Sequence, residues 1–232
     1  MKEKIITENN QSIYCYPGTS ILINKKNIMN KEQLHELENA SVIYKLSQLI
    51  EGKEPFRKDL TIEHYISLHR YLFGDLYEFG GELRKEFTNK TNDEIEGEEG
   101  IRIYCNPDFI YEALKDRLIT MKKEAIKVKS KEELVSFLAS NYMELYYIHP
   151  FREGNSRTLR EFLREYVELM NKFIITFGNY EIEYSALNDK DRENFIRATI
   201  WNTSKDQEKQ KNSIKLLENI FNKCLVEIQK TK

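Results

Sequence analysis

The sequence has few residues that break helices and few features of a secreted or membrane protein. Its 232 residues include only nine glycines and four prolines, which favours long helices. The three cysteines, Cys15, Cys105 and Cys224, lie far apart and form no CxxC pair, which indicates a reducing compartment and offers no zinc site. The N-terminus lacks an apolar signal segment, and no apolar run approaches the roughly 20 residues of a membrane span. We therefore expect a soluble, cytoplasmic protein without a membrane partner.

The chain also lacks an excess of charge of one sign. It has 36 lysines and arginines against 38 aspartates and glutamates, a formal net charge of −2. Binding to nucleic acid relies on clustered cations that neutralise phosphates, so we expect no nucleic-acid partner. The length suits one sizeable core, or a core with an appended arm.

Apolar residues recur at helical spacing along most of the chain. We expect a first helix from about Asn30 that Gly52 and Pro55 end, a second that Thr61 begins, and another that Ser130 opens. Further helices are predicted at 155–171 and 189–202 and in the tail 205–232. The apolar face of the tail suits either the core or a second copy of the chain, so a homodimer is one expectation. The pattern predicts an all-α fold.

Two segments depart from the helical pattern. Near the N-terminus, two short apolar pieces flank Pro17-Gly18 and predict an arm on the main body. Residues 86–88 and 101–104 have strand-like composition and flank an acidic tip that contains glycine. We interpret 86–104 as a β-hairpin, here called the flap. Its tip lacks the spacing of a calcium-binding loop, which indicates a solvated loop.

The densest chemistry lies in residues 149–160, HPFREGNSRTLR, between two predicted helices. The first N–H groups of a helix are unpaired and carry partial positive charge, which makes them an anion site. Gly154 allows a phosphate to approach the backbone, and Asn155 and Ser156 suit the start of the helix. This loop therefore predicts a phosphate cradle.

Four other side chains of the segment suit phosphate chemistry. Arg157 and Arg160 are three residues apart, so both project from one side of the helix, and guanidinium groups bind phosphate oxygens well. Glu153 suits magnesium, and His149, with an ordinary pKa of roughly 6.5, suits a general base. Each alone has an ordinary explanation as a capping, turn or solvated residue. Their convergence predicts a catalytic site that binds phosphate.

The segment resembles the HxFx[DE]GNxRxxR signature of Fic-domain proteins. A second stretch, LHRYLFGDLYEFGGELR at 68–84, resembles the upstream helix and turn of the same family, and the similarity covers roughly residues 40–200. Many members transfer AMP from ATP to a Ser, Thr or Tyr hydroxyl of a protein. The resemblance implies a mainly helical fold with a small hairpin flap, ATP as substrate and Mg²⁺. It divides the chain into an arm with the start of the first helix (1–40), a catalytic domain (41–204) and a C-terminal helix (205–232).

The resemblance also implies a role for each position of the motif. His149 becomes the general base, and Glu153 the magnesium ligand. The predicted ATP-binding residues are Gly154, Asn155, Ser156, Arg157 and Arg160, with Asn89 and Lys90 of the flap as further contacts. The flap is expected to dock the protein target by strand addition, which depends more on backbone than on side chains.

Ser156 is a departure from the family pattern. Many members that transfer AMP have glycine there, and the phosphotransferase branch has lysine there with alanine before the asparagine. Gly154 therefore favours AMP transfer to a target or to the protein itself. Phosphotransfer, removal of AMP, and a nucleotide-binding module without turnover remain alternatives.

Many family members are inhibited by a helix with the pattern [ST]xxxE[GN]. Residues 47–52, SQLIEG, fit this pattern, so helix 41–52 is predicted to be inhibitory, with Ser47 as its hydroxyl residue and Glu51 paired with Arg160. Two similar pairs, Glu38–Asn39 and Glu218–Asn219, rank lower, because Leu34 and Ile214 replace the hydroxyl residue.

Overall fold

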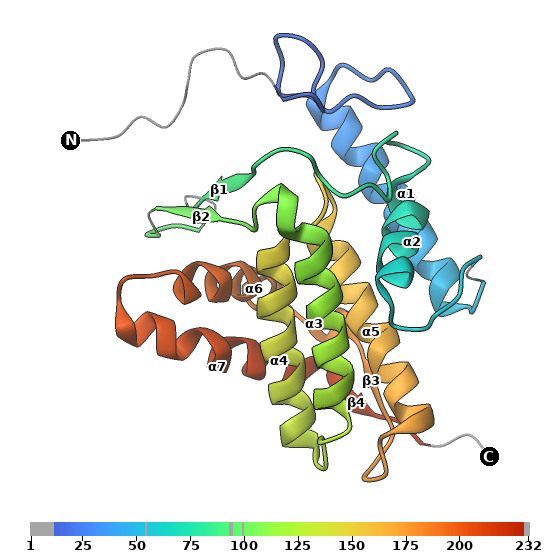
Figure 1. Cartoon of the computed structure of the whole chain (residues 1–232), viewed down its shortest axis with the longest axis vertical. Helices are drawn as coiled ribbons and strands as arrows, with labels where there is room; N and C mark the ends of the chain where they lie inside the picture. The colour runs from blue at the N-terminus through green and yellow to red at the C-terminus, as the bar shows by residue number, and fades with distance from the viewer. Residues whose placement is uncertain (1–11, 54, 93–94, 99, 230–232) are drawn as a thin grey trace.

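The computed structural model describes residues 12–229 except 54, 93, 94 and 99. Most of this part of the chain is α-helical (Figure 1). The helices are α1 (Lys31–Ile50), α2 (Ile62–Phe73), α3 (Ile110–Ala125), α4 (Lys131–Ile148), α5 (Asn155–Phe173), α6 (Asp189–Asn202) and α7 (Gln207–Cys224). The mainly helical fold with a hairpin flap is confirmed.

Strands in the described residues form two small antiparallel sheets. They are β1 (Asn89–Thr91) with β2 (Ile101–Ile103), and β3 (Tyr180–Ile182) with β4 (Leu225–Glu227). Short 3₁₀ helices occur at η2 (Pro107–Phe109) and η3 (Tyr184–Ala186). Figure 1 places the first sheet, which belongs to the flap, to the left of the upper ends of α3 and α4 and above α6.

Side-chain caps determine where several helices begin. The hydroxyl of Thr61 accepts a hydrogen bond from the His64 N–H at 3.3 Å, and that of Ser130 accepts from the Glu133 N–H at 3.2 Å. Such bonds satisfy N–H groups that have no partner within the helix. The predicted starts at these two positions are confirmed, and α6 has the predicted bounds.

Helix α4 lies at the centre of the fold, in contact with α3, α5 and α7. Its buried side chains cover most of its circumference, as expected for an interior helix. Helix α5 packs against α4, and its Leu163 and Val167 are completely buried. The loop between α4 and α5 therefore connects two helices that have many buried side chains.

The N-terminal arm and α1 lie against α2. A bridge between Cys15 and Leu22 joins the two arm pieces around the predicted turn, and the Lys25 N–H donates to the Leu76 carbonyl at 2.8 Å. Lys45 of α1 forms an ion pair with Asp75 at 2.6 Å. The predicted arm is thus present in residues 12–29, whereas residues 1–11 lie outside the described part.

Two sequence predictions need correction. The first flap strand begins at Asn89 rather than Glu86, because the Glu86 carboxylate binds the arm through the Ser12 hydroxyl (2.7 Å) and the Ile13 N–H (2.6 Å). The tail helix, predicted within 205–232, ends at Cys224, because the next residues pair with β3. Helix α3 and the sheet of β3 and β4 were not predicted at all.

Candidate active site

The chain reverses direction between α4 and α5 through a strained loop, here called the motif loop (149–154). His149 ends α4 with φ +46°, and Gly154 precedes α5 with φ +77°, both in the left-handed region. A Cβ placed on Gly154 would lie 2.3 Å from the Phe73 ring. Glycine is therefore required here by the backbone and by packing, as well as by the predicted approach of a phosphate.

The motif loop is fastened to the core by its own side chains. Asn155 Oδ1 accepts from the Phe151 N–H at 2.9 Å, and Asn155 Nδ2 donates to the Phe151 carbonyl at 2.7 Å. The Phe151 ring is completely buried and stacks on His69 at 3.6 Å between centroids. Asn155, predicted as part of the phosphate cradle, thus also holds the cradle in shape.

His69 connects the motif loop to the turn after α2. Its Nδ1 accepts from the Gly81 N–H at 2.8 Å, so its Nε2 carries the proton and donates to the Glu153 carbonyl at 2.9 Å. Burial lowers the pKa of His69 to about 3, which keeps the ring neutral. The sequence prediction missed this residue, although it lies in the second stretch that carried the resemblance.

The orientation and the protonation state of the His149 ring are set by its neighbours. Its Nδ1 lies 3.3 Å from the Tyr146 carbonyl, which assigns the proton to Nδ1 and leaves Nε2 as the basic nitrogen. The ring stacks on Tyr104 at 3.8 Å with an interplanar angle of 16°. Burial lowers the pKa of His149 well below its ordinary value, and the positive charges of Lys90 and Arg84 add to this. A neutral imidazole is the form that accepts a proton.

A carboxylate and an arginine meet at the start of α5. Glu153 Oε1 accepts from the Gly154 N–H at 2.8 Å and lies 3.3 Å from Arg157 Nη2. No side chain of the described residues caps α5, so the remaining N–H groups of its first turn are open to an anion. The Arg157 guanidinium lies over the Phe73 ring, 4.8 Å from its centroid.

Two adjoining cavities gather the predicted residues. The smaller, about 190 Å³, is lined by all but one of the predicted catalytic, ATP-binding and metal residues: Asn89, Lys90, His149, Glu153, Gly154, Asn155, Ser156 and Arg157. The larger, about 510 Å³, contains Arg160 and shares Glu153, Ser156 and Arg157 with the smaller cavity. The structure therefore brings the flap, the motif loop and both arginines together around two cavities that share lining residues.

Comparison with known proteins agrees with this geometry. A model of the Fic/DOC family matches residues 59–167. A probable protein adenylyltransferase of Sinorhizobium fredii is 31% identical over 195 residues, which span 83% of this chain and 88% of that protein. The chain belongs to the Fic/DOC family.

Other relatives extend the likeness. The protein adenylyltransferase VbhT of Bartonella schoenbuchensis is 29% identical over 67% of this chain and 30% of its own length. Two solved structures share the Fic/DOC fold. The N-terminal Fic domain of an effector protein from Bartonella sp. AR 15-3 has a TM-score of 0.74 at 21% identity, covering 94% of this chain and 95% of that one. BepC from Bartonella tribocorum, solved with bound AMPPNP, has a TM-score of 0.71 at 21% identity, covering 93% and 97%.

The inhibitory contact predicted for this Fic/DOC chain is wrong. Glu51 lies at the end of α1, where its carboxylate pairs with Lys53 at 2.5 Å instead of Arg160. The Ser47 hydroxyl donates to the Tyr44 carbonyl at 2.7 Å, also away from the motif. The short pattern matched a helix end, where a glutamate before a glycine has a local explanation.

Glu38 of α1 reaches the Fic/DOC motif instead. Its Oε1 lies 2.5 Å from Arg157 Nη2, and its Oε2 accepts from the Tyr77 hydroxyl. Asn39 Oδ1 accepts from Arg157 Nη1 at 3.4 Å. The lower-ranked pair Glu38–Asn39 is thus the one in contact with the motif, and Leu34, which lowered its rank, is buried in the core.

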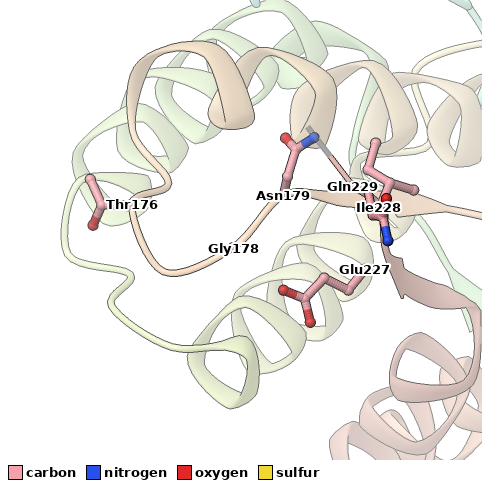
Figure 2. A pocket seen from close by; sticks show the side chains of 6 residues that line it. All are labelled: Thr176, Gly178, Asn179, Glu227, Ile228 and Gln229. Atoms are coloured by element: carbon pink, nitrogen blue, oxygen red, sulfur yellow. The ribbon is translucent and has the colours of Figure 1, made fainter. Parts of the chain in front are cut away.

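Other features of the Fic/DOC chain lie away from the motif loop or concern the chain as a whole. A hollow of about 550 Å³ lies between the loop after α5 and the end of β4, and among the described residues that line it Glu227 is the one with a charged side chain (Figure 2). Among the described residues no cluster of three histidine, cysteine or carboxylate side chains suits a metal ion. None of the described helices has the length and apolar character to span a membrane.

Proposed function

We propose that this protein transfers AMP from ATP to a Ser, Thr or Tyr hydroxyl of a target protein, itself included. The relatives named above as protein adenylyltransferases support this activity. The observation that carries the proposal is the position of His149, a neutral base in the same cavity as the open N-terminus of α5 and Glu153.

The two cavities suit a triphosphate. Backbone N–H groups at Asn155 and Ser156 favour phosphate oxygens, because the dipole of α5 adds positive potential there. Arg157 and Arg160 line the larger cavity, so they would bind the outer phosphates. The α-phosphate would then lie in the smaller cavity with His149, and Asn89 and Lys90 would cover it from the flap.

Glu153 suits magnesium. Its side chain is about a third exposed, at 38%, and only its Oε1 is used in contacts among the described residues. One carboxylate together with phosphate oxygens is the usual protein environment of Mg²⁺ on a nucleotide. Bound there, the ion would neutralise phosphate charge, so we assign Glu153 as its protein ligand.

The proposed reaction is an in-line displacement. The target hydroxyl oxygen attacks the α-phosphorus, the bond from this phosphorus to the bridging oxygen of the β-phosphate breaks, and pyrophosphate leaves. The hydroxyl proton passes to Nε2 of His149. The N–H groups of α5 and the two arginines stabilise the negative charge that develops on the phosphates.

The flap is proposed to present the target. Thr88, Asn89 and Lys90 line the smaller cavity, so a strand added beside β1 would pass close to His149. The nucleotide and the hydroxyl would therefore meet between the flap and the motif loop.

Parallel incubation with magnesium and ATP labelled at the α- or the γ-phosphate tests the activity, with labelled protein detected on a denaturing gel. AMP transfer predicts label from α-labelled ATP only, and loss of that label in His149→Ala. Label from γ-labelled ATP would show phosphotransfer. Nucleotide binding without label from either ATP, with or without a cell extract as the source of targets, would instead indicate a binding module.

A further inference from the structure

The flap has two unlike faces. Its facing pairs are Asn89–Ile103, Lys90–Arg102 and Thr91–Ile101. Successive side chains of a strand point to opposite faces, so Lys90 and Arg102 share one face and the other two pairs share the second. Arg102 is completely buried and donates to the Tyr146 hydroxyl at 2.9 Å, so its face is turned toward the body of the protein.

The outward face is apolar. Ile101 is 57% exposed and Ile103 is 71% exposed. Phe87, two residues before β1 and 72% exposed, belongs to the same face by alternation along the extended chain. Large apolar side chains gathered on one exposed surface indicate an interaction site rather than ordinary surface.

The edge of β1 next to the catalytic cavity is open for pairing. The Asn92 N–H donates to the Gly100 carbonyl at 3.0 Å, so the next hydrogen-bonded pair toward the base of the flap is Lys90–Arg102. The backbone N–H and C=O of Asn89 then point away from β2. No other strand of the described residues pairs with β1, and residues 88–90 line the cavity that contains His149. Such an edge accepts an added strand.

The alternation of side chains then constrains the target. A hydroxyl that reaches His149 must lie on the inward face of the added strand, as Lys90 does on β1. The residues directly before and after it must point outward, where facing side chains on neighbouring strands lie about 5 Å apart. If the hydroxyl residue lies opposite Thr88, one of its neighbours would lie beside Phe87 and the other beside Asn89. Ile103 lies on the far side of Asn89, on β2.

We propose that the target segment carries a large apolar residue immediately next to the modified hydroxyl, packed against Phe87 on the outer face of the flap, where Ile103 extends the apolar surface one strand further away. The inference rests on the proposed function, because it takes His149 as the base that the hydroxyl must reach. It adds one side-chain determinant to a docking mode that otherwise depends on backbone.

Two short peptides test the inference. Each has a central tyrosine in the same sequence, flanked on both sides by leucine in one peptide and by serine in the other. Their affinities for full-length His149→Ala protein are measured by fluorescence anisotropy, which needs no turnover. Burial of one leucine side chain predicts about tenfold tighter binding of the leucine peptide. Phe87→Thr, added to this protein, should bring the ratio closer to one, and Ile103→Thr, one strand further from the peptide, should lower the ratio to a smaller extent.

Phe173→Thr is the matched control. Phe173 is 80% exposed at the end of α5, away from the flap, so its loss should leave the tenfold ratio in place. Equal affinities, no binding of either peptide at millimolar concentration, or a preference that survives both flap variants would overturn the inference.

Transfer of label from α-labelled ATP to the same peptides by the wild-type protein is scored separately. Preferential binding without His149-dependent transfer would count against AMP transfer and support the docking surface. Equal transfer to both peptides would support AMP transfer and overturn the docking surface.

Discussion

His149 shows how neighbours set the chemistry of one side chain. Its Nδ1 is bound to the Tyr146 carbonyl, its ring stacks on Tyr104, and its carbonyl accepts from Arg84 Nε at 2.8 Å. The first two contacts limit rotation of the ring and the third fixes the main chain, while burial among cations disfavours the protonated form of the ring. The imidazole is therefore neutral at neutral pH, which is the form that the proposed base needs.

This protonation state predicts the pH dependence of transfer. Because the pKa of His149 is lowered, the neutral base persists as the pH falls through about 6.5, the value of a free histidine. The rate should stay level from about pH 8 to about pH 6.5 and fall only at lower pH. The measurement is the transfer rate at saturating ATP and magnesium between about pH 5 and pH 9.

A variant of the exposed His35, His35→Ala, should give the same pH profile as the wild type. His149→Ala should lose at least about a hundredfold in rate at every pH. An acid limb centred at or above about pH 6.5 would contradict the assignment of a neutral, buried base.

Glu38 predicts a second effect at the scale of one residue. Its carboxylate is buried and paired with Arg157, so a phosphate must share that guanidinium with an existing negative charge. Glu38→Gln removes the charge but keeps an oxygen for the Tyr77 hydroxyl. The dissociation constant of ATP should fall several-fold, as expected for removal of about 1 kcal/mol of repulsion.

Isothermal titration with a non-hydrolysable ATP analogue measures this constant. Glu36→Gln, on the exposed side of the same helix, is the control and should leave it unchanged. Weaker binding by Glu38→Gln would show instead that Glu38 orients Arg157 for the phosphates.

At the scale of an element, the start of α5 depends on one glycine. Gly154→Ala places a side chain at φ +77°, which costs about 1–2 kcal/mol, and adds a contact of 2.3 Å with the Phe73 ring. We expect the free energy of unfolding to fall by about 2–4 kcal/mol, measured by urea denaturation.

Gly52→Ala separates the two causes. Gly52 has φ +72°, and a Cβ placed on it would have no atom within 4 Å, so alanine there should cost only the backbone part. If both alanine variants are destabilised equally, packing against Phe73 does not contribute to the choice of glycine at 154.

The elements that the sequence predicted are those governed by local chemistry. Thr61, Ser130 and the motif loop carry their structural information within a few residues, as caps, turns and a helix start. Strand β4 could not be predicted in this way, because its partner β3 is more than forty residues earlier in the chain. The helical spacing of the tail continues past Cys224, so only the pairing partner reveals where the helix ends.

Contacts across the whole molecule decide the parts of the site that the sequence missed. The Glu38–Arg157 pair joins residues 119 positions apart, and the His69–Glu153 hydrogen bond joins residues 84 positions apart. The pattern [ST]xxxE[GN] favoured Glu51 because a short sequence pattern does not indicate which part of α1 faces α5. The motif contains the predicted catalytic and phosphate-binding residues, and the fold determines which carboxylate lies against Arg157.

The molecule has a net charge of −2 but contains a cavity lined by several cationic side chains. A nucleotide that binds there binds the folded state only, so it should stabilise the whole fold. At a hundred times its dissociation constant, ATP with magnesium adds about 2.7 kcal/mol, which for a domain of this size raises the melting temperature by about 5–10 °C. Thermal unfolding with and without nucleotide measures the shift. His149→Ala should keep it, because this base binds the target proton rather than the phosphates. Arg160→Ala, which breaks no ion pair among the described residues, should reduce it.

EDTA and Glu153→Gln should each reduce the shift in melting temperature, and their effects should not add to one another, because both remove the same metal contact. A full shift in EDTA would show that the phosphates bind through α5 and the arginines alone, and that Glu153 has another role.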